Sequence, residues 1–281
     1  MQTKYFIMKK VEWNSIDDWI YYHSKRGKLT FSRQELVADF SYLSPHTVKN
    51  NLNLLIKKGK IFPVFKGFYV VIPIDYALIG IVPPEFYIDD LMKYLNRPYY
   101  ISLLNAAVFY GAAHQKPQVS SIITSLPSLR DTTKKNIRII FISTRKEIPR
   151  KWLNTLRGEN GDFYTSTPEL TAVDLITFQK EIGGLNRACT VLYELMEVVK
   201  FGKIDQTFFN YVPTSTIQRL GYLLENELEQ SKQADILFSK AKTHGCKFQK
   251  IPLKYSKPTK KCETNTKWKI IINETIKIDD L

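Results

Sequence analysis

Amide, imidazole and ammonium side chains recur at helical spacing between residues 44 and 58. His46, Asn50, Asn53 and Lys57 follow one another in steps of four, three and four, so a helix places them on one face, with Lys49 on its flank. This face contains no carboxylate. Asn pairs with adenine through two hydrogen bonds, and Lys or His reaches guanine acceptors or phosphate. The pattern therefore predicts a helix that reads base edges.

The residues nearest the start of such a recognition helix are the ones that point at the bases. The candidate contacts on the helix are Ser44, His46, Thr47, Lys49, Asn50, Asn53 and Lys57. A second candidate contact is the turn that follows, where Lys66 and Gly67 form a basic tip that can touch the DNA backbone or the minor groove. The alternatives are a solvated face of an ordinary helix and a protein-interaction module.

Local start and stop signals define the elements that position these side chains. Ser32 and Glu35 have the capping-box spacing, in which each residue satisfies the free backbone donor of the other. Ser44 and Pro45 start a further helix, which Gly59 should end. An apolar stripe within residues 13–24 predicts an earlier helix.

The β-rich runs 60–64 and 68–72 flank Lys66-Gly67 and predict a hairpin, with Pro63 marking an edge strand. Three helices followed by a hairpin predict a winged helix-turn-helix in residues 1–80.

The composition favours a folded, nucleic-acid-binding protein of about two domains. The chain has 281 residues, and domains run to roughly 100–200 residues each. Hydrophobic residues make up 44%, which excludes a disordered chain. Lys and Arg number 41 against 27 Asp and Glu, and the resulting net charge of +14 favours polyanionic partners. Pro83-Pro84 is the expected boundary between residues 1–80 and a second domain over residues 81–281.

Motifs for catalysis are missing. No Gly is followed by Ser, no carboxylate precedes Lys by two positions, and no Gly-Lys pair is followed by Ser or Thr. Cys189, Cys246 and Cys262 form no CxxC pair, which argues against disulfides and a zinc ribbon. We therefore expect no enzyme, no cofactor, no metal site and no membrane segment, in a reducing, cytoplasmic compartment.

Residues 81–281 predict a larger mixed α+β domain with a small sheet. Helices are expected at 84–96, 102–110, 167–182, 185–200, 214–229 and 232–242, and strands at 119–124, 137–142, 248–253 and 268–272. Possible contacts to the DNA backbone are Arg130, Lys134, Lys135 and Arg138. Eight lysines between residues 247 and 269 suit either a solvated edge or the DNA backbone.

Several runs in this part resemble the AbiEi-type antitoxins of bacterial abortive-infection systems. They are Arg97–Ala107 (RPYYISLLNAA), Gly111–Gln118 (GAAHQKPQ), Thr167–Leu175 (TPELTAVDL), Gly183–Leu185 (GGL) and Gln218–Glu225 (QRLGYLLE). Their order and spacing are more specific than any one of them. Since most of these residues are apolar or small, packing is their expected role.

The resemblance implies a winged-helix transcriptional repressor of its own operon that is also the antitoxin of a type IV toxin–antitoxin pair. It implies an operator with inverted repeats and a nucleotidyltransferase-type toxin as functional partner, without a stable complex. The C-terminal domain would carry the antitoxicity. The alternative is a protein–protein adaptor that uses the winged helix without sequence-specific DNA binding.

Overall fold

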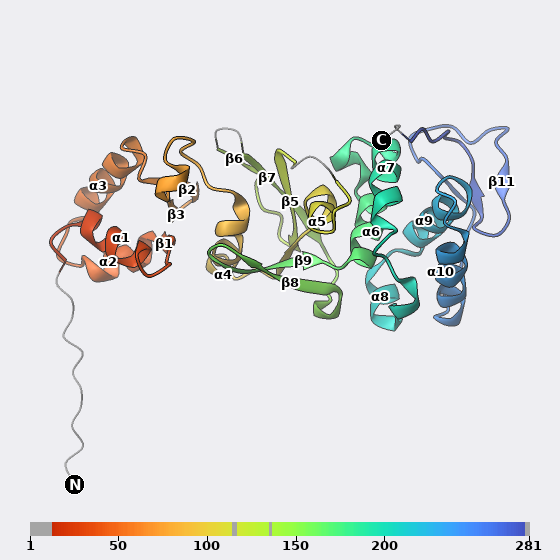
Figure 1. The fold of residues 1–281 in the computed structure, drawn as a ribbon, viewed down its shortest axis with the longest axis horizontal. Helices are drawn as coiled ribbons and strands as arrows, with labels where there is room; N and C mark the ends of the chain where they lie inside the picture. Colours follow the sequence, from red (N-terminus) through yellow and green to blue (C-terminus); the bar gives the residue numbers. More distant parts are fainter. Residues whose placement is uncertain (1–12, 114–116, 135–136, 279–281) are drawn as a thin grey trace, which may run out of the picture. The chain divides into compact units, whose positions relative to one another are not determined.

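The computed structural model describes residues 13–113, 117–134 and 137–278. The chain divides into two compact units (Figure 1). The first unit comprises Met1–Leu95 together with Gly158–Gly161, and the second comprises Asn96–Arg157 together with Asp162–Leu281. The protein is of the mixed α+β class, because helices and sheets occur in both units.

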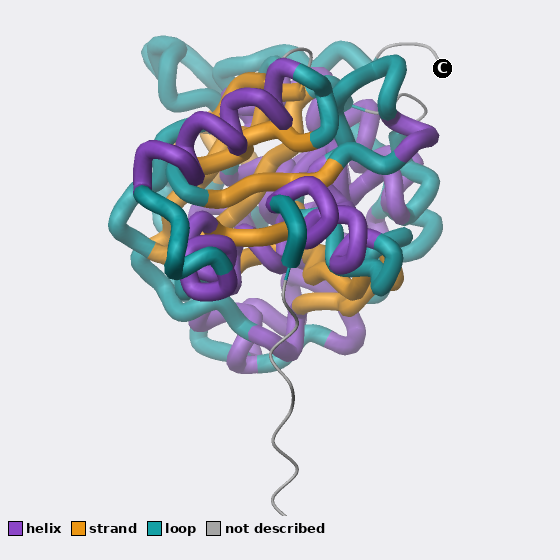
Figure 2. Tube along the Cα trace, turned by 90° about the vertical axis from the view of Figure 1, so that its left-hand side faces the viewer, coloured by secondary structure: helices purple, strands orange, loops and turns teal. Residues whose placement is uncertain are grey.

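The first unit begins with three helices and a three-stranded antiparallel sheet, and Figure 2 turns this unit toward the viewer. The elements are α1 (Ile16–Ser24), β1 (Thr30–Ser32), α2 (Arg33–Asp39), α3 (Pro45–Lys57), β2 (Ile61–Phe65) and β3 (Phe68–Val71). The strand order β1-β3-β2 places β2 at an edge. This confirms the expectation from Pro63, which has no N–H to donate to a further strand.

The predicted helix starts are present in the structure. Ser32 Oγ accepts a hydrogen bond from Glu35 N (3.1 Å), and Glu35 Oε2 accepts one from Ser32 N (2.7 Å), which completes the capping box of α2. Ser44 caps α3 with Pro45 in its first turn, and Gly59 follows the helix with a φ of 68°. Residues 45–57 are therefore one helix and residues 61–71 a hairpin, as the sequence predicts.

A compact apolar core fixes the orientation of α3. Val48, Leu52 and Leu55 are buried in it together with Trp19 and Phe40. Because these three α3 residues recur at helical spacing, one face of α3 is buried and the other faces solvent.

The first unit extends beyond the hairpin, as far as Leu95. The segment contains the 3₁₀ turns Ile74–Tyr76 and Pro84–Phe86, followed by α4 (Ile88–Tyr94), where the sequence suggested one helix over 84–96. Asp90 on α4 accepts a hydrogen bond from Thr30 Oγ1 (2.6 Å), and the ring of Tyr94 packs on Phe68. These contacts with the three-stranded sheet explain why the unit continues past Pro83-Pro84.

The second unit is built on a six-stranded sheet of order β6-β7-β5-β4-β9-β8. The strands are β4 (Tyr99–Ile101), β5 (Val119–Ser125), β6 (Thr132–Lys134), β7 (Ile137–Thr144), β8 (Leu153–Gly158) and β9 (Gly161–Ser166). Strands β5 and β7 run parallel from Val119↔Arg138 to Ser125↔Thr144. The expectation of a small sheet was therefore wrong, because residues 132–134 and 153–166 form strands that pair within it.

Helices and a short terminal sheet complete the second unit (Figure 1). The helices are α5 (Leu103–Phe109), α6 (Pro168–Thr177), α7 (Leu185–Leu195), α8 (Gln206–Tyr211), α9 (Thr214–Asn226) and α10 (Ser231–Thr243). The last strands are β10 (Ile251–Pro252), β11 (Thr264–Asn265) and β12 (Ile270–Ile271). One large apolar core joins α5, α6, α7, α9 and α10, and α6 is buried along most of its length.

Residues 13–113, 117–134 and 137–278 contain neither a membrane-crossing helix nor a metal-binding cluster. Over these residues no helix is both long and apolar enough to cross a bilayer. The same residues contain no cluster of three or more His, Cys, Asp or Glu side chains that could hold a metal ion.

Candidate nucleic-acid interface

The solvent-facing side of α3 carries the polar side chains that the sequence singled out. The exposed residues are Ser44, His46, Lys49, Asn50, Asn53 and Lys57, and Thr47 is half-buried. Ser44 and Thr47 are engaged in the helix cap, because Ser44 Oγ accepts from Thr47 N (3.1 Å) and lies 2.9 Å from Thr47 Oγ1. The remaining five side chains are the ones available to a partner.

His46 and Asn50 form a connected pair one helical turn apart. Asn50 Nδ2 lies 3.2 Å from His46 Nδ1, so the amide donates and the ring nitrogen accepts. In this arrangement the proton of a neutral imidazole resides on Nε2, and the other amide hydrogen and Oδ1 of Asn50 remain available. The pair therefore presents donors together with an acceptor, which is the combination that base edges require.

The exposed lysines on α3 and at the hairpin tip form no ion pair with a carboxylate of the described residues. Among the residues that the structure describes, Lys49, Lys57 and Lys66 take part in no ion pair, whereas Lys60 pairs with Asp17 (2.5 Å). Glu35, the carboxylate of the α2 capping box, is neutralised by an ion pair with Lys28. Uncompensated positive charge therefore remains on the α3 face and at the hairpin tip, where it can attract phosphate.

The hairpin tip is held in place by backbone contacts from two sides. Gly67 has a φ of 77°, a conformation that suits glycine. Its carbonyl accepts from Arg33 N (2.8 Å), and the carbonyl of Lys66 accepts from Tyr94 Oη (3.2 Å). A Cβ added at Gly67 would lie 2.9 Å from Tyr94 Oη. These contacts fix the backbone and leave the Lys66 side chain exposed.

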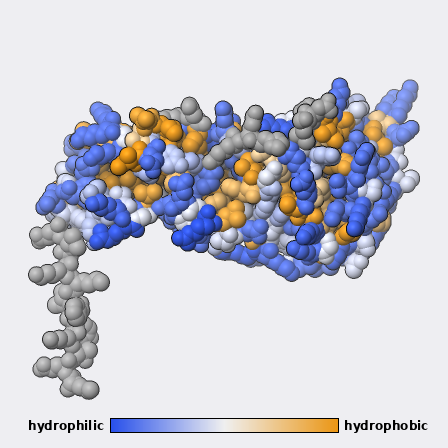
Figure 3. Space-filling model, viewed as in Figure 1, coloured by the Kyte–Doolittle hydropathy of each residue, from blue (hydrophilic) through white to orange (hydrophobic). Residues whose placement is uncertain are grey.

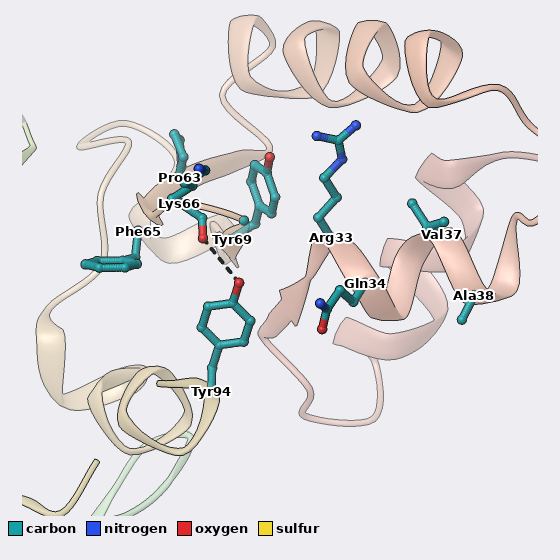
Figure 4. Close-up of a pocket in the computed structure, with 10 residues that line it drawn as sticks. Arg33, Gln34, Val37, Ala38, Pro63, Phe65, Lys66, Tyr69 and Tyr94 are labelled. Carbon is teal, nitrogen blue, oxygen red and sulfur yellow. Dashed lines mark hydrogen bonds between the residues drawn. The ribbon is translucent and has the colours of Figure 1, made fainter. Parts of the chain in front are cut away.

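Arg33 is a candidate contact that the sequence analysis did not select. It is the first residue of α2, and its Nη2 lies 3.4 Å from the carbonyl oxygen of Pro45 at the start of α3. Figure 4 shows its guanidinium extending away from α2 above a groove that also borders Lys66 and Tyr94. The sequence feature that could have identified Arg33 is its position directly after the capping Ser32, but only the fold brings it next to α3.

The other basic candidates belong to the second unit. Arg130 and Lys134 are exposed near the edge strand β6, and Arg138 on β7 pairs with Asp131 (3.1 Å). Lys135, like His114 in one of the family-like runs, lies outside the described residues. Arg130, Lys134 and Arg138 thus belong to the second unit, whereas the candidate contacts on α3 and at the Lys66-Gly67 turn belong to the first.

The lysine-rich segment 247–269 is partly used to build the fold. Lys254 and Lys257 pair with Glu274, Lys267 pairs with Glu225 and Asp235, and Lys269 Nζ donates to the carbonyl of Phe248. Among the described residues, the exposed lysines of this segment whose ammonium groups make neither an ion pair nor a hydrogen bond are Lys247, Lys250, Lys260 and Lys261. Half of this charge therefore has a structural role.

Two of the family-like runs meet at a buried carboxyl. Asp174 Oδ2 accepts hydrogen bonds from Ser102 Oγ (2.7 Å) and Tyr100 Oη (3.1 Å), and Tyr100 Oη also lies 3.1 Å from Tyr211 Oη. Burial raises the pKa of Asp174 to about 7, and the two hydrogen bonds offset this only in part. Burial also raises the pKa of Tyr211 to about 12. No motif in the sequence points to this cluster, because Asp174 and Tyr100 are distant along the chain.

A third family-like run, on α9, anchors the C-terminal segment. Gln218 Nε2 donates to the carbonyls of Gln249 (2.7 Å) and Trp268 (2.8 Å). Arg219 is buried and donates from Nε to the carbonyl of Leu253 (3.1 Å). At the far end of the run, Glu225 Oε2 accepts from the Trp268 indole N–H (2.5 Å). These residues are therefore structural, as expected, although three of them act through polar contacts.

Comparison with known proteins gives one family and a small number of similar folds. Residues 100–226 match the family model of the AbiEi antitoxin C-terminal domain. The RV2827C protein from Mycobacterium tuberculosis has a similar fold, with a TM-score of 0.60 at 13% identity over 94% of this chain and 94% of that chain. At this identity the likeness concerns the fold alone.

An antigenic nucleotidyltransferase-like protein from Paracoccidioides brasiliensis aligns with a TM-score of 0.36 and 9% identity, over 54% of this chain and 90% of that chain. This score is too low to support an inference. No curated protein matches the sequence. The matched residues 100–226 contain the buried Asp174 cluster and the α9 run, so this part of the chain carries the likeness to the AbiEi antitoxin C-terminal domain.

Proposed function

We propose that the protein is a DNA-binding repressor of its own operon and the antitoxin of a type IV toxin–antitoxin system. Its family domain supports an antitoxin role. We further propose that α1 to β3 form a winged helix-turn-helix, in which α3 is the recognition helix and the Lys66-Gly67 turn is the wing. A cytoplasmic location and a double-stranded operator with inverted repeats belong to this proposal, as does a functional partner of the nucleotidyltransferase type.

The observation that supports DNA binding most directly is the solvent-facing side of α3. It combines the His46–Asn50 pair with Lys49, Asn53 and Lys57, without a carboxylate. A recognition helix enters the major groove with its N-terminal residues toward the bases, so His46 and Asn50 would contact base edges. Lys49, Lys57 and the wing residue Lys66 would contact phosphates, with Lys134 and Arg130 as further backbone contacts.

Binding of fluorescent DNA from upstream of the protein's own gene tests this assignment. Asn50→Ala should weaken binding to this operator by roughly 1–3 kcal/mol and have little effect on scrambled DNA, as expected for a lost base contact. The matched control is Asn51→Ala, because Asn51 is half-buried and its amide donates to Thr47 O (2.9 Å) within the helix. Equal weakening of both DNAs by Asn50→Ala would show that α3 does not read the bases.

Phosphate contacts should behave differently from base contacts. Lys66→Ala should weaken operator and scrambled DNA alike, and it should flatten the slope of log K against log salt by about one unit. Lys28→Ala is the control, because Lys28 is paired with Glu35 (2.5 Å) in the same unit. If the wild-type protein shows no preference for the operator, the adaptor function becomes the better explanation.

Antitoxicity is assigned to residues from about 81 onward, where the family domain lies. This proposal requires no catalytic step, because neutralisation would not depend on a reaction carried out by this chain. An Asn50→Ala variant that no longer represses should still protect cells that express the neighbouring toxin. Loss of protection in step with the loss of operator binding would overturn the division of roles.

A further inference from the structure

Three large aliphatic side chains are exposed in the segment that follows β3. The exposed fractions are 91% for Ile74, 103% for Leu78 and 61% for Ile79. We call residues 73–80 the knuckle, and Figure 3 shows hydrophobic surface on this first unit. Single exposed apolar residues are common, but a contiguous group of them marks an interaction site.

Backbone hydrogen bonds hold the knuckle in one conformation. Tyr76 N donates to Pro73 O (3.0 Å), Ala77 N to Ile74 O (3.0 Å) and Gly80 N to Tyr76 O (2.7 Å). The Tyr76 ring packs edge-on against Phe86, with centroids 5.1 Å apart. The exposed side chains are therefore presented from an ordered turn, which lowers the entropy cost of binding a partner.

The surroundings of the knuckle are acidic. Asp75 is exposed between the aliphatic residues. Burial, followed by the charges of Glu159, Glu85 and Asp75, raises the pKa of Tyr76 at its base. A partner for this surface should therefore be apolar and carry positive charge.

The same unit contains a groove of that kind, with a volume of about 800 Å³. Its walls are an exposed face of α2, the hairpin and α4, and they include Val37, Ala38 and Tyr94 (Figure 4). Among the described residues that line it, Arg33 and Lys66 are charged and none is an acid. Pockets of roughly 300–1,000 Å³ accommodate a drug-sized group, so three aliphatic side chains are within its capacity.

We propose that the knuckle of one copy of this chain inserts into the groove of a second copy, with Asp75 facing Arg33. Shape and charge support this occupant, since an apolar projection with an acid meets an apolar groove with cations. A single contact of this kind is head-to-tail and leaves one knuckle and one groove unused. Its small area predicts weak association that grows with protein concentration. This proposal does not rest on DNA binding.

Sedimentation velocity over a series of protein concentrations tests the proposal. DNA is left out of these samples, because Lys66 lines the groove and is also the proposed wing contact. Leu78→Asp in the knuckle and Val37→Asp in the groove should each lower the association constant by about tenfold or more. Leu54→Asp is the matched control, because Leu54 is exposed (48%) on α3 and belongs to neither surface. All three positions are exposed, and circular dichroism would verify that the variants fold.

Mixing the two variants tests whether the knuckle and the groove contact each other. An equimolar mixture of Leu78→Asp and Val37→Asp retains one intact knuckle and one intact groove, so a pair should form again. The charge reversal Asp75→Arg should weaken association, and Arg33→Glu in the same chain should restore it. A wild-type protein that remains monomeric at every concentration, or a mixture that fails to associate, would overturn the proposal. If a variant fails to fold, Ile74→Asp and Ala38→Glu address the same two surfaces.

Discussion

Asp174→Asn is the change that most directly tests how the family domain is held together. The Asp174 carboxyl is buried and accepts two hydrogen bonds, from Ser102 and Tyr100. Its pKa is about 7 in the folded protein, against an ordinary value of 3.8, because burial disfavours the charged form. Asn has nearly the same shape and keeps an acceptor oxygen, but it does not titrate. The substitution therefore removes the charge change with little loss of packing.

The sign of the effect follows from proton counting. Between about pH 4 and pH 7 the folded protein holds a proton on Asp174 that the unfolded chain has released. Stability is therefore highest below about pH 4 and falls as the pH rises, by about 1.4 kcal/mol per pH unit for this one group. Across the whole interval the contribution is at most about 4 kcal/mol. Above about pH 7 the group is ionised in both states and its contribution is constant.

Urea unfolding of the full chain at several pH values between about 4 and 8 measures this contribution. The free-energy difference between Asp174→Asn and the wild-type protein should shift in favour of the variant as the pH rises. Asp162→Asn is the control, because Asp162 is exposed in the same unit and pairs with Arg157 (3.6 Å). A difference between Asp174→Asn and wild type that stays constant over this pH range would refute the reasoning.

Two further predictions concern the second unit. Gly221→Ala places a Cβ 2.1 Å from the Trp268 ring and should destabilise the protein by about 1–3 kcal/mol. Gly202→Ala is the control, because Gly202 has open space around it, and it should have almost no effect in the same urea experiment. Partial burial disfavours the charged form of Asp205, but the hydrogen bonds led by Lys151 prevail and hold its pKa at about 2. Asp205→Asn should therefore lower the free energy of unfolding by about 1 kcal/mol at neutral pH, after allowance for solvent screening. This loss of stability should disappear as the pH falls from about 4 to 2. A loss that is unchanged at low pH would contradict the assignment.

Elements with local signals were predictable from the sequence. Ser32 with Glu35 and Ser44 with Pro45 start α2 and α3 where their residue types indicate, because a cap is made within a few residues. Pro63 marked an edge strand for a similarly local reason, the missing N–H. The exposed side of α3 followed from helical periodicity alone.

Features that depend on distant residues were not predictable. Strand β6 lies in a segment that reads as a loop, and it exists because Thr132 pairs with Ile139 on β7. The Asp174 cluster needs Tyr100 from a strand and Asp174 from a helix, and no spacing in the sequence connects them. Arg33 was missed for the same reason, since only the packing of α2 places it beside Pro45.

The segment Gly158–Gly161 belongs to the first unit although both of its flanks belong to the second. In it, Asn160 Nδ2 donates to the carbonyl of Phe86 (3.0 Å). The chain therefore passes between the units three times, and the first unit is discontinuous in sequence. A protease that cuts after Leu95 would produce two fragments that share this unit, so they should migrate together until they are denatured. A gene fragment that ends at Leu95 would lack a part of the first unit. Expression of that unit alone therefore requires that Gly158–Gly161 be included.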